Sequence, residues 1–294
     1  MYKRVSIALA KPEIALSLRL VTLVFLVSLA IAKSDGLSIG SFSDLHFTFP
    51  LIALAGLLSF FNLGTEALKY QVLFGREGIN FPMAFRSFLS GMAVGIWTPN
   101  RVGEVIGRIK SAPSGRKKQA LEASVLGSFL QGSVTLTFGC WVLLVGVDLP
   151  NPLMPYASWI YALAGSALLI LFGLSILRKS RSTKPSVLLE AFCLAFMRYL
   201  IFATQFAIVL FSFGFNGTLV EAFLGIGILY LLQSFIPGSF LSELGIREVL
   251  SILIFSDYFD QPMAAPLAAF SLWIINIGMP VIFWAFTKRK EEGA

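Results

Sequence analysis

Residues 97–108, WTPNRVGEVIGR, interrupt a long apolar run with a proline, two glycines and three charged side chains. The pattern returns at residues 235–248, FIPGSFLSELGIRE, again with a proline, glycines and charges of both signs. Proline ends a preceding helix and fits the first turn of the next, because that position needs no backbone N–H. The two stretches therefore predict two broken helices inside apolar regions. The expected breaks are Pro99, Gly103, Pro237, Gly238 and Gly245.

The composition is that of an integral membrane protein. Of 294 residues, 56% are hydrophobic and only 13% are charged, whereas soluble domains carry about 25% charged residues. A span needs about 20 apolar residues, and such runs recur at 14–32, 48–70, 119–147, 156–177, 186–213 and 263–286. We expect an all-α polytopic membrane protein, with one transmembrane domain over residues 1–294. The first of its six full spans is expected to be retained rather than cleaved as a signal peptide.

The positions of lysine and arginine predict the topology, because cytoplasmic loops of membrane proteins are rich in both residues. Most of the 23 lie in the N-terminal segment, in the loops at 69–81, 108–118 and 178–184, and in the tail. Both ends of the chain are therefore expected in the cytoplasm. The same bias accounts for the net charge of +7, so we expect no nucleic-acid partner.

The regions 82–110 and 218–255 each lie between two loops of the same kind. The loops around the first are both basic, whereas those around the second carry no lysine or arginine. Each region must then return to the side that it entered from, as a re-entrant helical hairpin. The span–hairpin–span units at 48–147 and 186–286 run in opposite senses. We therefore predict an inverted repeat, which is an architecture of secondary transporters.

The apices of the two hairpins are candidate anion-binding sites. A helix N-terminus presents free backbone N–H groups and the positive end of the helix dipole, and both favour anions. The returning helix of the first hairpin would present Asn100 and Arg101. The returning helix of the second would present Gly238 and Ser239.

Charged side chains at membrane depth form the second part of the candidate site. Their spacing places Arg101, Glu104 and Arg108 on one helix face, and Glu243 and Arg247 are also four residues apart. An uncompensated charge near the bilayer centre costs about 3 kcal/mol or more. Such charges must therefore pair with each other, with water or with a charged ligand. The alternative to a binding role is that ion pairs between these residues only hold the broken helices together. The candidate headgroup-binding or coupling residues are Asn100, Arg101, Glu104, Arg108, Arg198, Ser239, Glu243, Arg247 and Glu248.

Other charged residues fall inside the predicted spans and hairpins. Arg86, in the first hairpin, is a further candidate cation for the same cavity. Glu66 and Glu122 lie near the cytoplasmic ends of their spans. We expect these two carboxylates to be solvated at the membrane interface.

The two motifs resemble those of a known family. The pattern P-x-R-x-G-E-x-x-x-R, formed here by Pro99, Arg101, Gly103, Glu104 and Arg108, is similar to a mark of the lysylphosphatidylglycerol synthase transmembrane-region family. These proteins are also called flippase-like integral membrane proteins. The later segment at 236–250, IPGSFLSELGIREVL, resembles that family's I-P-x-S-x-G-x-x-G-x-R-E segment. The residues that match it are Pro237, Ser239, Gly245, Arg247 and Glu248.

The resemblance covers essentially the whole chain and implies a lipid-handling protein of a bacterial cytoplasmic (inner) membrane. Some members carry an aminoacyltransferase domain after the last span, which this sequence does not show. Members often have charged residues after the first motif, where this chain reads SVLGSFLQG, with Gly127, Ser128 and Gln131 in their place. Position 243 is glutamate where glycine is common. These departures bear on the substrate more than on the fold.

The sequence offers little for catalysis. Its one histidine, His46, lies in a polar loop, and it has neither an H-E-x-x-H motif nor a G-x-S-x-G nucleophile motif. Cys140 and Cys193 lie within apolar runs and suggest neither a disulfide nor a metal site. We therefore expect no enzyme, no cofactor and no metal.

The expected function is that of a lipid translocase. A phospholipid or a polyprenyl-phosphate-linked lipid would place its headgroup in a polar cavity near the bilayer midplane, while its tails stay in the membrane. The alternative is an ion- or proton-coupled transporter of a small polar solute that uses the same charges. A membrane scaffold without transport is a third reading. The oligomeric state is open, and a homo-oligomer is among the alternatives.

Overall fold

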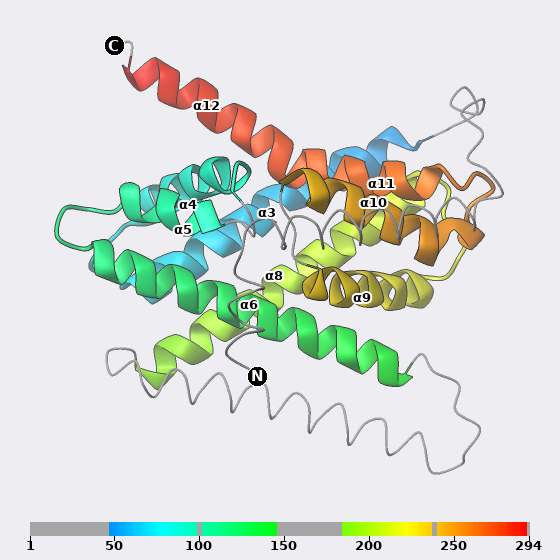
Figure 1. Cartoon of the computed structure of the whole chain (residues 1–294), viewed down its shortest axis with the longest axis horizontal. Coiled ribbons are helices and arrows are strands. Elements are labelled where there is room, and N and C mark those ends of the chain that lie inside the picture. Colours follow the sequence, from blue (N-terminus) through cyan, green and yellow to red (C-terminus); the bar gives the residue numbers. More distant parts are fainter. Residues whose placement is uncertain (1–46, 99–101, 146–183, 237–239, 293–294) are drawn as a thin grey trace, which may run out of the picture.

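The computed structural model describes residues 47–98, 102–145, 184–236 and 240–292, which contain helices and turns but no strand. Figure 1 shows the helices packed as one bundle. Its elements are α3 (Phe49–Phe74), α4 (Phe81–Gly95), α5 (Val102–Lys110), α6 (Lys117–Val145), α8 (Pro185–Ser212), α9 (Leu219–Phe235), α10 (Phe240–Phe255), the 3-10 turn η3 (Ser256–Tyr258), α11 (Ala264–Trp273), the π-helical turn η4 (Ile274–Gly278) and α12 (Met279–Glu292).

Four helices in the described part of the chain are long and apolar enough to cross a membrane. They are α3, α6, α8 and the continuous helix over Ala264–Ala285, which includes α11, η4 and the start of α12. These helices coincide with four of the six spans expected from the sequence. The other two, at 14–32 and 156–177, lie outside the described residues.

Small residues on α8 allow this helix and its neighbours to approach closely. Helix α8 places Ala191, Ala195, Ala203 and Ala207 on one buried face, and these alanines belong to the main apolar cluster. Helix α3 packs along α8. In a bilayer, lipid tails are as apolar as the helices, so close packing between small residues stabilises helix association. The alanine face therefore fixes the position of α8 against its neighbours.

Helices α4 and α5 form a tightly packed hairpin. A Cβ added at Gly107 would lie 2.6 Å from the backbone oxygen of Ser90, and one at Gly103 would lie 2.5 Å from that of Val94. Only glycine fits such an approach. Gly103 was expected to break the helix, but it lies within α5 and serves as a packing residue instead. The turn between the two helices falls between Gly95 and Val102. Pro99, the other break expected in this hairpin, lies outside the described residues.

Helices α9 and α10 form the second hairpin. Helix α9 begins with a capping box, in which Thr218 and Glu221 satisfy each other's backbone N–H groups. Gly245 was expected to break a helix, but it lies inside α10, so this prediction is wrong. The expected breaks at Pro237 and Gly238 lie outside the described residues.

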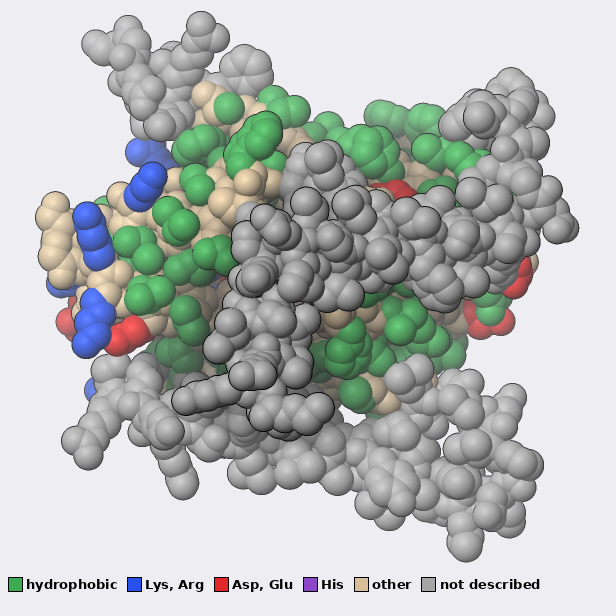
Figure 2. Space-filling view, viewed as in Figure 1, with side chains coloured by type: hydrophobic (Ala, Val, Ile, Leu, Met, Phe, Trp, Pro, Cys, Tyr) green, Lys and Arg blue, Asp and Glu red, His purple; other side chains and the backbone are tan. Residues whose placement is uncertain are grey.

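The two hairpins occupy opposite halves of the bundle. In Figure 1 the α4–α5 pair lies in the left half, next to the loop that leads into α6, and the α9–α10 pair lies in the right half. The exposed basic residues Lys110, Arg116, Lys117 and Lys118 belong to that loop region. On the face in Figure 2, lysine and arginine side chains gather at the same end. The bundle therefore has one strongly basic end.

Candidate functional site

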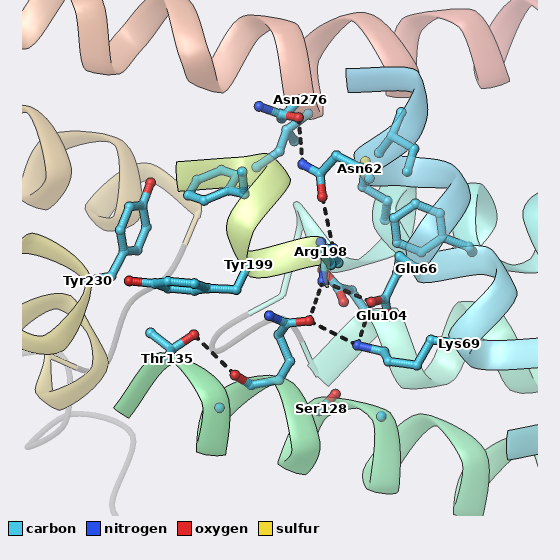
Figure 3. A pocket seen from close by; sticks show the side chains of 18 of the residues that line it. Asn62, Glu66, Lys69, Glu104, Ser128, Thr135, Arg198, Tyr199, Tyr230 and Asn276 are labelled. Carbon is cyan, nitrogen blue, oxygen red and sulfur yellow. Dashed lines mark hydrogen bonds and ion pairs between the residues drawn. The ribbon is translucent and has the colours of Figure 1, made fainter. Parts of the chain in front are cut away.

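A cavity of about 400 Å³ lies between the hairpins and the long helices. Its walls come from α3, α4, α5, α6, α8, α9, α10 and η4. Figure 3 shows side chains from these elements converging on it. Its charged lining residues are Glu66, Lys69, Glu104, Arg108, Arg198 and Arg247. Four cations thus face two carboxylates, so the lining has an excess of positive charge.

Glu66 lies at the centre of the charge cluster. Its carboxylate is 2.6 Å from Lys69 Nζ, 2.9 Å from Arg198 Nη1 and 3.1 Å from Arg108 Nη2. The residue is only 4% exposed, so it is not solvated at the interface as the sequence suggested. Glu122 is half-exposed beside Lys118, in line with that expectation. One carboxylate therefore balances cations from three helices.

Lys69 is part of helix α3 and not of the loop to which we assigned it. The residue is 1% exposed, and its ammonium group also donates to Gln131 Oε1 at 3.1 Å. The spacing of three residues from Glu66 places both side chains on the same helix face. This cation therefore belongs to the cavity and does not contribute to the basic loop.

Arg108 reaches the cavity from α5 and is fixed on several sides. Its guanidinium carbon lies 5.2 Å from the ring centroid of Tyr70 and 5.3 Å from that of Phe88, which are cation–π distances. The nearest oxygen of Glu104 is 3.9 Å away, across one turn of the same helix. Arg108 is 3% exposed, and these contacts replace part of its hydration, but its Nε has no hydrogen-bond partner among the described residues.

Arg198 lies at the more open side of the cluster. Its Nε donates to Asn62 Oδ1 at 3.0 Å, and its Nη1 donates to Glu66 at 2.9 Å. The side chain is 25% exposed, in contrast with Lys69 and Arg108. A planar guanidinium has five donors. Arg198 is therefore oriented by protein contacts and still has donors available to a ligand in the cavity.

Arg247 brings a buried cation from α10. The residue is 4% exposed and lines the cavity, and its Nε has no hydrogen-bond partner among the described residues. In that part of the chain, both carboxylate oxygens of the adjacent Glu248 also lack a donor. Buried polar groups are normally satisfied, and an exception requires an explanation such as a bound ion or water. Arg247 is thus equipped to receive an anion.

A chain of side-chain amides extends the cluster into the long helices. Asn62 Nδ2 donates to Asn276 Oδ1 at 2.9 Å, and Asn276 Nδ2 donates to Gln205 Oε1 at 2.9 Å. Gln205 Nε2 in turn donates to the backbone oxygen of Ala55 at 2.8 Å. Asn276 lies in the π-helical turn η4. Such turns occur often at functional sites, and here the turn lies where the amide chain meets the cavity (Figure 3).

The structure brings together part of the predicted site. Glu104, Arg108, Arg198 and Arg247 line one cavity although they come from three different helices. Arg86 is exposed on α4 and is not among the lining residues. Glu243 lies in α10, but its side chain is outside the described part. The remaining predicted residues outside the described part are Asn100, Arg101 and Ser239.

The helix α3 side of the site was not predicted from the sequence. Ser59, Asn62, Glu66 and Lys69 are three or four residues apart and form one polar stripe on an otherwise apolar helix. Three of them line the cavity, and Ser59 hydrogen-bonds Asn276 at 3.2 Å. Helical periodicity of polar residues inside a predicted span is the signal that could have identified them. The stretch with Gly127, Ser128 and Gln131 also lines the cavity, from α6.

Comparison with protein-family models, curated proteins and solved structures finds no match to this chain. The resemblance to the flippase-like family therefore rests on the two sequence motifs. The structure shows a cavity that is rich in buried cations, within a bundle that has helices long and apolar enough to cross a membrane.

Proposed function

We propose that this protein is a lipid translocase that binds a phosphate-bearing headgroup in the charged cavity. The observation that carries the proposal is the excess of buried positive charge in a cavity between membrane-spanning helices. A phosphate group supplies the missing negative charge. It also accepts paired hydrogen bonds from guanidinium groups, which match its geometry.

The energetic cost of the cavity supports a ligand. Translocon-based scales assign about 3 kcal/mol to one arginine or lysine at the centre of a membrane helix. Glu66 pairs with three cations, but the Nε atoms of Arg108 and Arg247 have no acceptor among the described residues. A bound anion would offset this cost, since it would pair with Arg247 and with the remaining donors of Arg198.

The two hairpins supply a route for transport. We infer that α4–α5 is re-entrant from the basic side and α9–α10 from the opposite side, because they occupy opposite halves of the bundle (Figure 1). The surrounding helices would then form an inverted repeat. Rocking of one repeat against the other would open the cavity first to one leaflet and then to the other. The basic end would lie in the cytoplasm of a bacterium, following the distribution of positive charge.

The proposal is tested by measuring lipid movement in proteoliposomes. A fluorescent phosphatidylglycerol is incorporated, and dithionite quenches only the outer leaflet. Arg198→Gln and Arg247→Gln should each lower the rate about tenfold or more, because a hydrogen bond to a charged group contributes about 1.5–3 kcal/mol. Arg86→Gln, which removes an exposed cation that does not line the cavity, is the matched control and should keep the wild-type rate.

Two results would contradict the proposal. One is a wild-type rate that is no higher than that of protein-free vesicles. The other is uptake of water-soluble glycerol phosphate, with the same dependence on Arg198 and Arg247 and without lipid movement. The second result would assign the cavity to a small anionic solute.

A further inference from the structure

A second hollow lies beside the charged cavity and has the opposite character. It is an apolar groove of about 660 Å³ between α3, α4, η4 and α12. Eleven of its twelve lining residues have no polar side-chain group, and the exception, Ser59, is bonded to the backbone oxygen of Ile275 at 3.2 Å. The lining residues are Ala53, Gly56, Leu57, Ser59, Phe60, Leu63, Phe85, Leu89, Ile275, Met279, Pro280 and Phe283.

The groove and the charged cavity share a wall. Leu63 lines both, and it packs with Phe88, Met92 and Ile277 in one buried cluster. These three partners line the charged cavity, whereas Phe85, which packs against the cluster, lines the groove. The apolar cluster around Leu63 is therefore the boundary between a site for charge and a site for hydrocarbon.

The groove opens at the outer surface of the membrane-spanning helices. Phe60 on α3 is 71% exposed, and Phe283 on α12 is 62% exposed. Both lie in helices that are long and apolar enough to cross the membrane. In a bilayer such side chains contact lipid tails. A hydrocarbon chain can therefore enter the groove directly from the membrane.

We propose that the apolar groove binds one acyl chain of the lipid whose phosphate lies in the charged cavity. The inference rests on the proposed function, since it assigns the two hollows to two parts of one molecule. The adjacency of the two hollows at Leu63 favours this occupant, because the glycerol region of a lipid joins its phosphate to its acyl chains over a short distance. The groove thus restricts the substrate class to phosphate-bearing lipids with acyl or prenyl chains.

Two glycines allow each hollow to be filled separately, and a third provides a control. A Cβ added at Gly56, Gly64 or Gly132 meets no atom within 4 Å. Gly56 lines the apolar groove, Gly132 lines the charged cavity, and Gly64 lines neither. The first side-chain carbon of a leucine therefore has room at each position. Gly64→Leu is the matched control, because it lies on the same helix as Gly56.

The test uses the full chain in lipid nanodiscs with a photoreactive lipid. Trace phosphatidylglycerol with a diazirine in one acyl chain is compared with diacylglycerol that has the same chain and no phosphate. Mass spectrometry measures the label on the groove segments of α3 and α12, relative to the label near the exposed Leu189 and Leu200 of α8. We expect this ratio to be at least about fivefold higher for the phosphate lipid in the wild type.

The variants should separate the two parts of the site. Gly132→Leu should lower the ratio for phosphatidylglycerol to that of diacylglycerol, since the headgroup loses its cavity. Gly56→Leu should lower the groove label with both lipids, and Gly64→Leu should change neither. Equal ratios for the two lipids in the wild type would overturn the inference and leave only surrounding lipid in the groove. An unlabelled groove beside a labelled α8 surface would also overturn it, and would indicate that a second copy covers the groove.

The outcome can be told apart from a failure of the proposed function. If lipid movement is absent but the groove label still depends on the phosphate, the lipid site stands and transport is refuted. If lipid movement depends on Arg198 and Arg247 while the label is independent of the phosphate, transport stands and the acyl-chain site is refuted.

Discussion

Replacing Glu66 by glutamine should strongly destabilise the protein. The carboxylate lies within 3.1 Å of Lys69, Arg108 and Arg198, and the first two of these cations are almost completely buried. Removing one partner of a buried ion pair typically costs about 3–5 kcal/mol, because the other charge stays buried without compensation. A carboxamide keeps the shape of the side chain and one acceptor. We therefore expect Glu66→Gln to lower the free energy of unfolding by about 3 kcal/mol, which is more than a hundredfold in the unfolding equilibrium.

The assay is reversible denaturation of the purified protein in micelles. Glu190→Gln is the matched control, because Glu190 pairs with Arg76 where the arginine is exposed and the glutamate is partly exposed. Exposed ion pairs contribute at most about 1 kcal/mol, so the control should unfold almost as the wild type does. Adding Lys69→Met to Glu66→Gln should recover part of the loss, because it removes one of the uncompensated cations.

The result also reports on the ligand. Glu66→Gln makes the cavity more positive by one charge, so an anion should stabilise this variant more than the wild type. Inorganic phosphate is the probe, and the shift in the denaturation midpoint is the readout. If Glu66→Gln and Glu190→Gln shift stability equally, or if Lys69→Met deepens the loss, the reasoning about the buried cluster is refuted.

Three further predictions concern the packing and the loops. Gly107→Leu should lower the free energy of unfolding by about 1–3 kcal/mol in the same denaturation assay, because a Cβ there already lies 2.6 Å from a backbone oxygen of α4. The control Gly64→Leu should not lower it, and equal losses in the two variants would contradict the tight packing of the hairpin. Asn276→Leu should lower the free energy of unfolding by about 2 kcal/mol or more, because it leaves the buried amides of Asn62 and Gln205 without their partner. An unchanged denaturation midpoint would exclude a structural role for the amide chain. The backbone N–H of Thr218 keeps the pKa of Glu221 below its ordinary value, so the start of α9 should be stable at neutral pH and should loosen as the pH falls through that lowered pKa. Hydrogen exchange there, corrected for its intrinsic pH dependence, should rise on acidification in the wild type but not in Glu221→Gln.

The sequence predicted what depends on local pattern. Apolar runs located α3, α6, α8 and the helix over Ala264–Ala285, since the length and composition of a span are properties of one segment. The spacing of charges also predicted that Glu104 and Arg108 lie one helical turn apart, as they do. The predicted glycine breaks at Gly103 and Gly245 were wrong, because both residues lie inside helices. At Gly103 the glycine permits close packing against α4 instead of a turn.

What the sequence did not reveal depends on contacts between helices. Glu66 resembles an interfacial carboxylate when only its own span is considered, and its burial follows from cations supplied by α5 and α8. Lys69 was counted with the basic loop because it lies near the predicted end of its span. The continuation of α3 to Phe74 places it inside the bundle instead. Asn276 gave no local signal, since a single asparagine in an apolar run does not indicate a π-helical turn.

The most direct test of the central claim is an electron-cryomicroscopy map of the protein in nanodiscs that contain phosphatidylglycerol. We expect phosphate density in the charged cavity, about 3 Å from a guanidinium nitrogen of Arg198 or Arg247. That density should be continuous with a hydrocarbon chain that passes Leu63 into the apolar groove. A cavity that contains only water, with every resolved phosphate outside it, would contradict the claim that these buried cations bind a lipid headgroup.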